Sequence, residues 1–401
     1  METYLYQAIT SEGIEKKGSI KAENEREAQL RIRETGLIPI SVSRQNFLNK
    51  DIELSFLKGK VKQRDMAVFC RQFSSIIKAG ISIVSALEML EEQTEDSSLK
   101  EGIKRARAGV EKGESLADSL REDKIFPSIL IEMIKAGESS GSLEKSLDRM
   151  AIQFEKEAKL KGIIKKAMMY PIVLLIVMIG ILVVMLTFVI PNFVTMFEDL
   201  NTSLPTSTKL IIGLSDLFRN YWLLLVVLVA FLIFLYKIYK ASDGGRHKID
   251  GIKLKLPIFG KLAVKTACAS ISRTLATLIQ SGMPLISALD ITAQTMPNIH
   301  YKDALIKMKG GVALGIPLSS QMKTMDIFPA MLTHMVGIGE QTGNMEEMLS
   351  NSANYYEEEV EITTTSLTAL LEPVIIIIMA LLVILLIAAI YQPMIQLYNS
   401  I

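Results

Sequence analysis

The stretch PIVLLIVMIGILVVMLTFVI, residues 171–190, decides the fold class. It has 20 residues and no charge. A helix rises about 1.5 Å per residue, so this length covers the roughly 30 Å hydrocarbon core of a bilayer. A core helix of a water-soluble protein rarely reaches this length without a polar face. The stretch therefore predicts a membrane-spanning helix.

Two further stretches have the same character. YWLLLVVLVAFLIFLYKIY, residues 221–239, has aromatic residues at both ends, which suits anchoring at both membrane interfaces, and Lys237 is close enough to one end to snorkel. PVIIIIMALLVILLIAAIY, residues 373–391, has no charge. Apolar residues make up 49% of the chain. The sequence thus predicts an integral membrane protein with three transmembrane helices.

Basic residues indicate the orientation, because cytosolic flanks of membrane helices are enriched in Lys and Arg. The segment between the first two spans, 191–220, contains only Lys209 and Arg219. Many more basic residues precede the first span or follow the second: Lys156, Lys159, Lys161, Lys165, Lys166, Lys237, Lys240, Arg246, Lys248, Lys253, Lys255, Lys261 and Lys265. We therefore expect a cytosolic N-terminus, an external loop at 191–220 and an external tail at 392–401. The first residues, METYLYQAITSEG, lack the apolar region of a cleaved signal peptide.

The cytosolic parts repeat each other at a constant offset of 202 residues. RQFSSIIKAGISIVSALEML begins at Arg71 and corresponds to RTLATLIQSGMPLISALDIT, which begins at Arg273. The same offset pairs Pro171 with Pro373. An ungapped register over this distance indicates two copies of one unit, each a helical bundle followed by one membrane helix. The second span has no counterpart and returns the chain to the cytosol, so we expect parallel copies related by a pseudo-two-fold axis along the membrane normal.

The periodicity within each copy is helical. The first module covers 63–170 and the second covers 265–372, with a basic linker at 240–264 before the second. Six helices are predicted in the first module: 65–78, 82–94, 99–111, 115–121, 127–136 and one that starts at 142 and continues into the membrane. Ser115 is a predicted N-cap.

The N-terminal region, residues 1–45, differs from the rest of the chain. TYLYQAIT, KKGSIKAE and LIPISVS alternate or carry β-branched residues and predict three short strands, with a helix at 25–34. Residues 46–62 are expected to form a linker. The predicted fold class is therefore mostly α: an integral membrane protein with three transmembrane helices, two repeated cytosolic helical bundles and a small α+β N-terminal region.

Several motifs together resemble the GspF/PilC family of inner-membrane platform proteins from type IV pilus and type II secretion systems. A G-E-x-x-G turn occurs twice, at 137–141 and 339–343. The other matching residues lie at the N-terminus, at the start of the first module and at the entry to the first span: Tyr4, Tyr6, Ala8, Asp65, Ala67, Val68, Phe69, Arg71, Gln72, Ala79, Gly80, Ile81, Ala167, Tyr170 and Pro171. The second copy departs from this pattern, with Thr266-Ala267 at its start and Glu372-Pro373 at the membrane.

The resemblance implies a function without catalysis. Such proteins sit in the bacterial inner membrane, contact a hexameric secretion ATPase and other inner-membrane assembly proteins, and usually self-associate. They are expected to couple the ATPase to extraction and polymerisation of pilins or pseudopilins. The resemblance does not distinguish a type IV pilus from a type II secretion system.

The sequence predicts no catalytic, cofactor-binding or metal site. It contains no G-x-x-x-x-G-K-[ST], G-x-S-x-G or H-E-x-x-H motif, and its three histidines are scattered. The net charge of +1 gives no sign of nucleic-acid binding. Cys70 and Cys268 are expected to be buried apolar residues. The alternative function, a membrane transporter or channel subunit, is disfavoured because the spans lack Asp, Glu, Arg and His.

Two repeated turns are the first candidate sites: Gly137, Glu138 and Gly141 in the first copy, and Gly339, Glu340 and Gly343 in the second. In one interpretation, each carboxylate accepts hydrogen bonds from free backbone N–H groups of the next helix. In the other, it lies in an interface, where it pairs with a basic residue of another subunit or binds a hard cation.

The second candidate sites are the membrane entries at Tyr170, Pro171, Glu372 and Pro373. Proline removes one backbone hydrogen bond and can kink a helix. Each position is therefore either an ordinary point of helix entry at the membrane interface or a hinge that transmits motion from the bundle to the membrane. The modules also differ in charge, because the second has fewer charges and these are mostly acidic: Glu346, Glu347, Glu357, Glu358, Glu359 and Glu361. This difference indicates either drift after duplication or a division of labour in which the first copy faces the ATPase.

Overall fold

The computed structural model describes residues 2–9, 15–22, 24–34, 38–44, 61–189, 191, 206–257 and 259–400, in two units, 1–60 and 61–401. The first unit contains β1 (Glu2–Ile9), β2 (Glu15–Ala22), α1 (Glu25–Glu34) and β3 (Ile38–Arg44). The strands form an antiparallel sheet in the order β2-β1-β3. Most of the predicted linker 46–62 and half of the predicted external loop lie outside the described residues.

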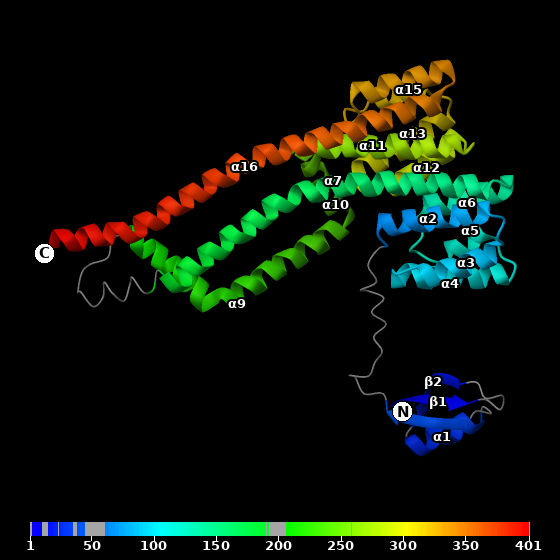
Figure 1. Cartoon of the computed structure of the whole chain (residues 1–401), viewed down its shortest axis with the longest axis horizontal. Coiled ribbons are helices and arrows are strands. Elements are labelled where there is room, and N and C mark those ends of the chain that lie inside the picture. Colours follow the sequence, from blue (N-terminus) through cyan, green and yellow to red (C-terminus); the bar gives the residue numbers. More distant parts are fainter. Residues whose placement is uncertain are drawn as a thin grey trace. The chain divides into compact units, whose positions relative to one another are not determined.

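Six helices form the first module (Figure 1): α2 (Gln63–Lys78), α3 (Ile83–Gln93), α4 (Ser97–Glu111), α5 (Leu116–Arg121), α6 (Ser128–Ser140) and α7 (Leu143–Val184). Side-chain caps explain several of the starts. Ser82 accepts from the Ser85 N–H, Asp96 from the Leu99 N–H and Ser115 from the Asp118 N–H. These caps satisfy backbone donors that have no partner within the helix.

The second module repeats this plan: α11 (Phe259–Gln280), α12 (Leu285–Thr295), α13 (Ile299–Ala313), α14 (Leu318–Lys323), α15 (Ala330–Thr342) and α16 (Met345–Ser400). The left-handed glycines recur at the same offset: Gly80, Gly113 and Gly141 in the first copy, and Gly282, Gly315 and Gly343 in the second. Positive φ favours glycine because it has no Cβ, so the duplicated glycines preserve the same turns.

The fifth helix of the first module differs from its prediction. It was expected to end at Ala136, but α6 continues to Ser140, so Gly137 and Glu138 lie within its last turns. Gly141 alone takes the left-handed conformation, with φ 65°. The Ser142 N–H bonds to the Gly137 carbonyl, which closes a Schellman-type end. Glycine lies within the helix at position 137 because the next helix passes so close that there is no room for a side chain.

Three helical stretches of the described residues are long and apolar enough to cross a membrane: Leu143–Val189, Phe259–Gln280 and Met345–Ile384. The first contains residues 171–189 of the predicted first span, and the third contains residues 373–384 of the predicted third span. In the second, which is α11, 56% of the apolar window is buried within the protein. We therefore interpret α11 as a core helix of the second module, because a lipid-facing helix would leave its side chains exposed.

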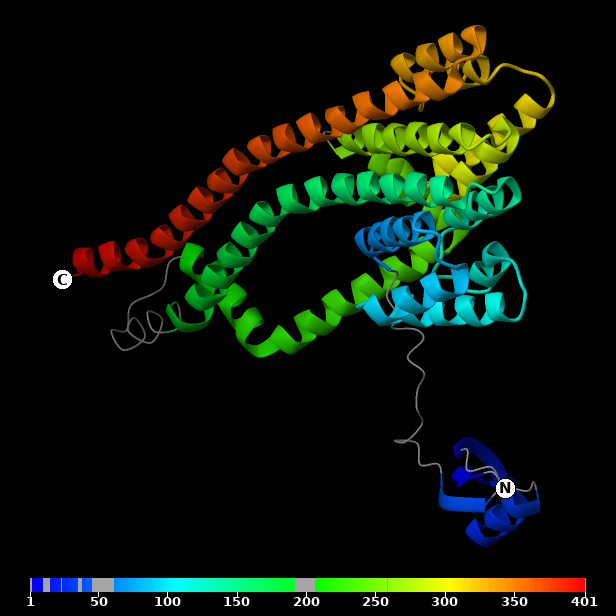
Figure 2. The same ribbon diagram turned by 45° about the vertical axis from the view of Figure 1, so that its right-hand side comes forward.

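The predicted second span, 221–239, lies in α9 (Thr206–Ala241). Its side chains from Val226 to Tyr239 are exposed, as expected for a helix that faces lipid. The backbone of Tyr221 is not helical, so α9 has a kink at the first residue of the predicted span. A short π-helix, η2 (Met185–Val189), ends the α7 segment, and α10 (Asp243–Lys255) links α9 to the second module. Figure 2 shows α7 and α16 leaving their modules toward the same end.

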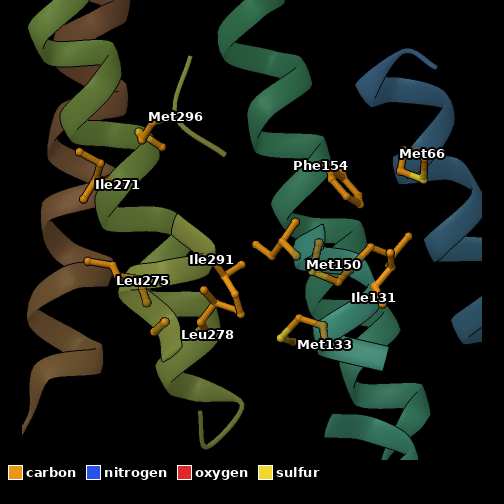
Figure 3. Close-up of a cluster of buried hydrophobic side chains, with 14 of the residues drawn as sticks. Met66, Ile131, Met133, Met150, Phe154, Ile271, Leu275, Leu278, Ile291 and Met296 are labelled. Carbon is orange, nitrogen blue, oxygen red and sulfur yellow. The ribbon is translucent and has the colours of Figure 1, made fainter. Parts of the chain in front are cut away.

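The two modules share one contiguous hydrophobic core. Figure 3 shows Met133 and Met150 of the first module on the side that faces Leu278 and Ile291 of the second. A pseudo-two-fold axis would place equivalent faces of the two copies against each other. Instead, α7 of the first copy lies against α11 as well as its counterpart α16, and α6 lies against α12. Gln153 and Ile291 are buried in this contact while their counterparts Tyr355 and Met89 are exposed, so the contact is not two-fold symmetric, contrary to the expectation. The modules meet through two different faces.

Candidate functional site: carboxylate caps and membrane entries

Glu138 caps a helix that begins far from it in the sequence. The N–H of Leu116 donates to Glu138 Oε1 at 2.7 Å, and the N–H of Ala117 donates to Oε2 at 3.1 Å. Both groups lie in the first turn of α5, where backbone donors have no partner within the helix. The negative charge also suits the positive end of the helix dipole.

Glu340 repeats this geometry in the second copy. The N–H of Leu318 donates to Glu340 Oε1 at 2.5 Å, and the N–H of Ser319 donates to Oε2 at 3.0 Å. The Ser319 hydroxyl also donates to Oε2. One difference matters: α5 has a second cap in Ser115, whereas the N-cap residue of α14 is Pro317, which makes no side-chain cap.

The glycine beside each carboxylate allows a close helix crossing. A Cβ on Gly137 would lie 3.0 Å from the Leu143 Cα, and a Cβ on Gly339 would lie 3.0 Å from the Met345 Cα. These contacts involve backbone atoms of the following helix. That helix could move away only if α6 separated from α7, or α15 from α16. The G-E-x-x-G sequence therefore joins three helices, because Gly allows the crossing, Glu caps the short helix and the last Gly ends the helix.

These contacts bear on the two interpretations of the carboxylates. The structure shows the carboxylates bonded to backbone donors, but those donors belong to the short helix that starts 22 residues earlier and not to the next helix. The sequence could not locate them, because only the folded bundle brings α5 beside the end of α6. The interface role of Glu138 and Glu340 stays a prediction.

The membrane entries lie inside continuous helices. Pro171 is an internal residue of α7 and is buried, while Tyr170 beside it is exposed. Glu372 and Pro373 are internal residues of α16, and both are exposed. Each module is therefore joined to its membrane segment by a helix without a connecting loop. The hinge hypothesis for these residues stays a prediction.

A repeated set of polar contacts connects the first and last helix of each module. The Arg71 guanidinium bonds to Glu155, and the Arg273 guanidinium bonds to Glu357, at corresponding positions of the two copies. Sequence reasoning missed these pairs. The signal was present, because each charged residue has an identical counterpart 202 residues later.

A second repeated contact lies nearer the membrane end of the same two helices, and here the donor differs. Gln63 Nε2 donates to Glu157 at 2.7 Å, and Lys265 Nζ donates to Glu359 at 2.5 Å. The carboxylate is the same in both copies, but an amide in the first is replaced by an ammonium group in the second. Burial raises the pKa of the Glu157 carboxyl.

Comparisons with known proteins agree with the repeat. The sequence profile described as "Type II secretion system (T2SS), protein F" matches residues 69–191 and 271–393, which are offset by 202 residues. The profile of the N-terminal domain of this protein family matches residues 1–43.

Similar proteins include two with the description "Type IV pilus assembly protein PilC". The protein from Pseudomonas aeruginosa is 37% identical over 92% of this chain and 98% of its own length, and that from Thermus thermophilus is 36% identical over 89% and 88%. A "Type II secretion system protein F" from Vibrio cholerae is 29% identical over 88% of each chain. The chain therefore belongs to the type II secretion system protein F family, a family of non-enzymatic membrane platform proteins.

Proposed function

We propose that this protein is the inner-membrane platform of a filament-assembling machine, and that it couples a cytosolic hexameric ATPase to extraction and polymerisation of pilin subunits. One observation carries the proposal: each of two like modules continues into the membrane through a single unbroken helix, α7 or α16. A displacement of either module is thereby passed to the bilayer without loss in a flexible loop.

The relatives favour a type IV pilus over a type II secretion pseudopilus. Identity is 36–37% to the two pilus assembly proteins and 29% to the secretion protein. Deletion of the gene should abolish surface pili and leave secreted enzymes at normal levels. Loss of secretion with intact pili would assign the protein to secretion, and no change in either would remove the proposal.

The coupling itself is tested by contacts. We expect photo-crosslinkers on exposed residues of the first module, such as Glu101 or Glu122, to capture the ATPase, because this module has the higher density of charge. The same crosslinker on Thr324, the exposed counterpart of Glu122 in the second module, is the matched control. Capture of the ATPase only from the second module would overturn the division of labour, and capture from neither would overturn the coupling.

The membrane orientation is part of the proposal. The modules and the N-terminus are placed in the cytosol, as the basic flanks suggest. Cysteines introduced in place of Lys112 and Leu314, which are exposed and correspond at the 202-residue offset, should both resist a membrane-impermeant thiol reagent in intact cells and react after lysis. Labelling of one of them before lysis would place the two copies on opposite sides and contradict the parallel arrangement.

The entry prolines are proposed to act as hinges that transmit motion from module to membrane, because the helix continues across each proline and can bend there at one fixed point. Pro171→Ala restores a backbone hydrogen bond in α7 and should stiffen this helix. We expect fewer pili at an unchanged protein level. Pro373→Ala is the comparison in α16. Full pilus output from both variants would discard the hinge. Glu138→Gln tests the interface role in the same assay, and unchanged complex formation and pilus output would reject it.

A further inference from the structure

The contact between the two modules fits one helix into a groove. Helix α7 of the first copy lies against both α11 and α16 of the second. Gln153 of α7 bonds to Thr274 and Thr277 of α11, at 3.3 and 3.0 Å. Lys156 of α7 bonds to Glu357 of α16 at 3.2 Å. The groove between α11 and α16 is therefore filled by α7.

The equivalent groove of the first copy, between α2 and α7, is open. It contains a hollow of about 310 Å³ lined by Arg71, Ser74, Ser75, Lys78, Glu144, Lys145, Asp148 and Arg149. At the offset of 202 residues, Ser75 corresponds to Thr277. Thr277 is buried against Gln153, whereas Ser75 is exposed. The first copy thus has the receiving groove without a helix in it.

The second copy has the inserting helix without a groove. Gln153 is 1% exposed, and its counterpart Tyr355 on α16 is 42% exposed. Leu160 is 9% exposed, and its counterpart Ile362 is 52% exposed.

The same asymmetry continues to the neighbouring helix. Ile291 of α12 is 7% exposed, and its counterpart Met89 of α3 is 38% exposed. The first module therefore has an open groove between α2 and α7, and the second module has an exposed face of α16 that lies in no groove.

We infer that a second copy of this chain fills the groove. The outer face of α16, which contains Tyr355 and Ile362, lies between α2 and α7 of the next chain. The contact repeats the one already formed within the chain, so Tyr355 takes the place of Gln153 and lies at Ser75 of the neighbour. An interface between two different faces is heterologous, and it builds a ring when its rotation closes or an open row when it does not.

Charge supports this occupant. Helix α16 contains no Lys, Arg or His from Met345 to Ser400, and its cytosolic part is acidic. The hollow between α2 and α7 is lined by four cationic side chains and two carboxylates. Opposite potentials steer association and disfavour wrong pairings. Arg71 and Lys78 already pair with carboxylates of α7, so Lys145 and Arg149 are the cations of the hollow that an acidic helix would meet.

The membrane segments also permit the repetition. Figures 1 and 2 both show α7 and α16 running side by side toward the same end. The rotation and translation that superimpose one module on the other therefore leave both membrane helices extending in the same direction. A further copy placed by a similar operation keeps its own helices in the same bilayer. This separates the inferred contact from many surface contacts that would turn a neighbour away from the membrane.

Disulfide crosslinking in native membranes tests the contact. Ser75→Cys and Tyr355→Cys in one chain should yield, on mild oxidation, linked dimers and larger species. Coexpressed chains that each have one of the two substitutions should yield dimers only, and either single variant alone should stay monomeric. The native Cys70 and Cys268 are buried and provide the background. The largest linked species reports the number of chains in a closed ring.

A matched control uses the contact within the chain. Gln153→Cys with Thr277→Cys should form an internal disulfide, which shows that oxidation detects this geometry. Met89→Asp, added to the Ser75→Cys and Tyr355→Cys chain, should reduce linked species roughly tenfold, the change expected for about 1.4 kcal/mol. Failure of the 75–355 pair to link while the control links would overturn the inference. So would linkage of either single variant to itself, or linkage of the pair only to a different protein.

Discussion

The two modules have corresponding helices and the same carboxylate caps at Glu138 and Glu340, but they bury different faces. In the first copy, the α6–α7 face is covered by the second copy, and the α2–α7 groove is open. In the second copy, the α11–α16 groove is filled, and the outer face of α16 is open. Duplication thus determined the bundle, while position in the chain determined which face is buried. A residue and its counterpart can therefore differ sharply in their tolerance of substitution.

The largest expected effect compares Ile291 with Met89. Ile291→Asp places a charge in the apolar contact between the modules, where no partner compensates it, and should cost roughly 3–5 kcal/mol of stability. Met89→Asp changes a largely exposed position and should alter monomer stability by about 0.5 kcal/mol or less. Thermal unfolding of each full-length variant in detergent measures the difference. Equal costs at the two positions would mean that the modules do not pack through unlike faces.

A smaller difference is expected at the carboxylate caps. Glu340→Ala and Glu138→Ala each leave two backbone N–H groups without an acceptor, which costs about 1–3 kcal/mol. Glu340 should lie at the upper end, because α14 begins at Pro317 and has no second cap, whereas α5 retains Ser115. Hydrogen exchange of the amides of Leu318 and Leu116 measures local opening in each variant. Faster exchange in the Glu138 variant than in the Glu340 variant would contradict this order.

The smallest expected effect is a change in stability that has opposite signs at corresponding glutamates of the two copies. Burial raises the pKa of the Glu157 carboxyl above its ordinary value of 4.5. Above pH 4.5 the unfolded chain releases this proton first, so the stability decreases as pH rises toward the folded pKa. Glu157→Gln should therefore raise the melting temperature at pH 8, with the gain disappearing near pH 4.5.

The counterpart should behave in the opposite way. Glu359 accepts from Lys265, so Glu359→Gln removes a partly buried ion pair and should lower stability at pH 8 by about 0.2–1 kcal/mol. Melting curves of both variants at pH 5 and pH 8 provide the measurement. A gain in both variants would mean that the exchange of Gln63 for Lys265 has no electrostatic consequence.

Local patterns predicted much of this architecture. The apolar spans, the 202-residue offset, the six helices of each module and the Ser115 cap all depend on neighbours in the sequence, and the structure confirms the helical plan. Cys70 and Cys268 are buried, as expected. The length of α6 was underestimated because Gly137 was taken for a turn residue. Its real role is to let α7 pass, and this depends on a helix that packs from outside the local pattern.

The sequence by itself determined that this is a duplicated helical membrane protein, because periodicity and apolar length are properties of a single stretch of chain. Only the tertiary structure decided what Glu138 and Glu340 bond to and how the copies meet. The sequence suggested a symmetric pair, whereas the folded chain places unlike faces together. The physical reason is that burial and hydrogen bonding between distant helices depend on packing, and near-identical modules can pack in more than one way.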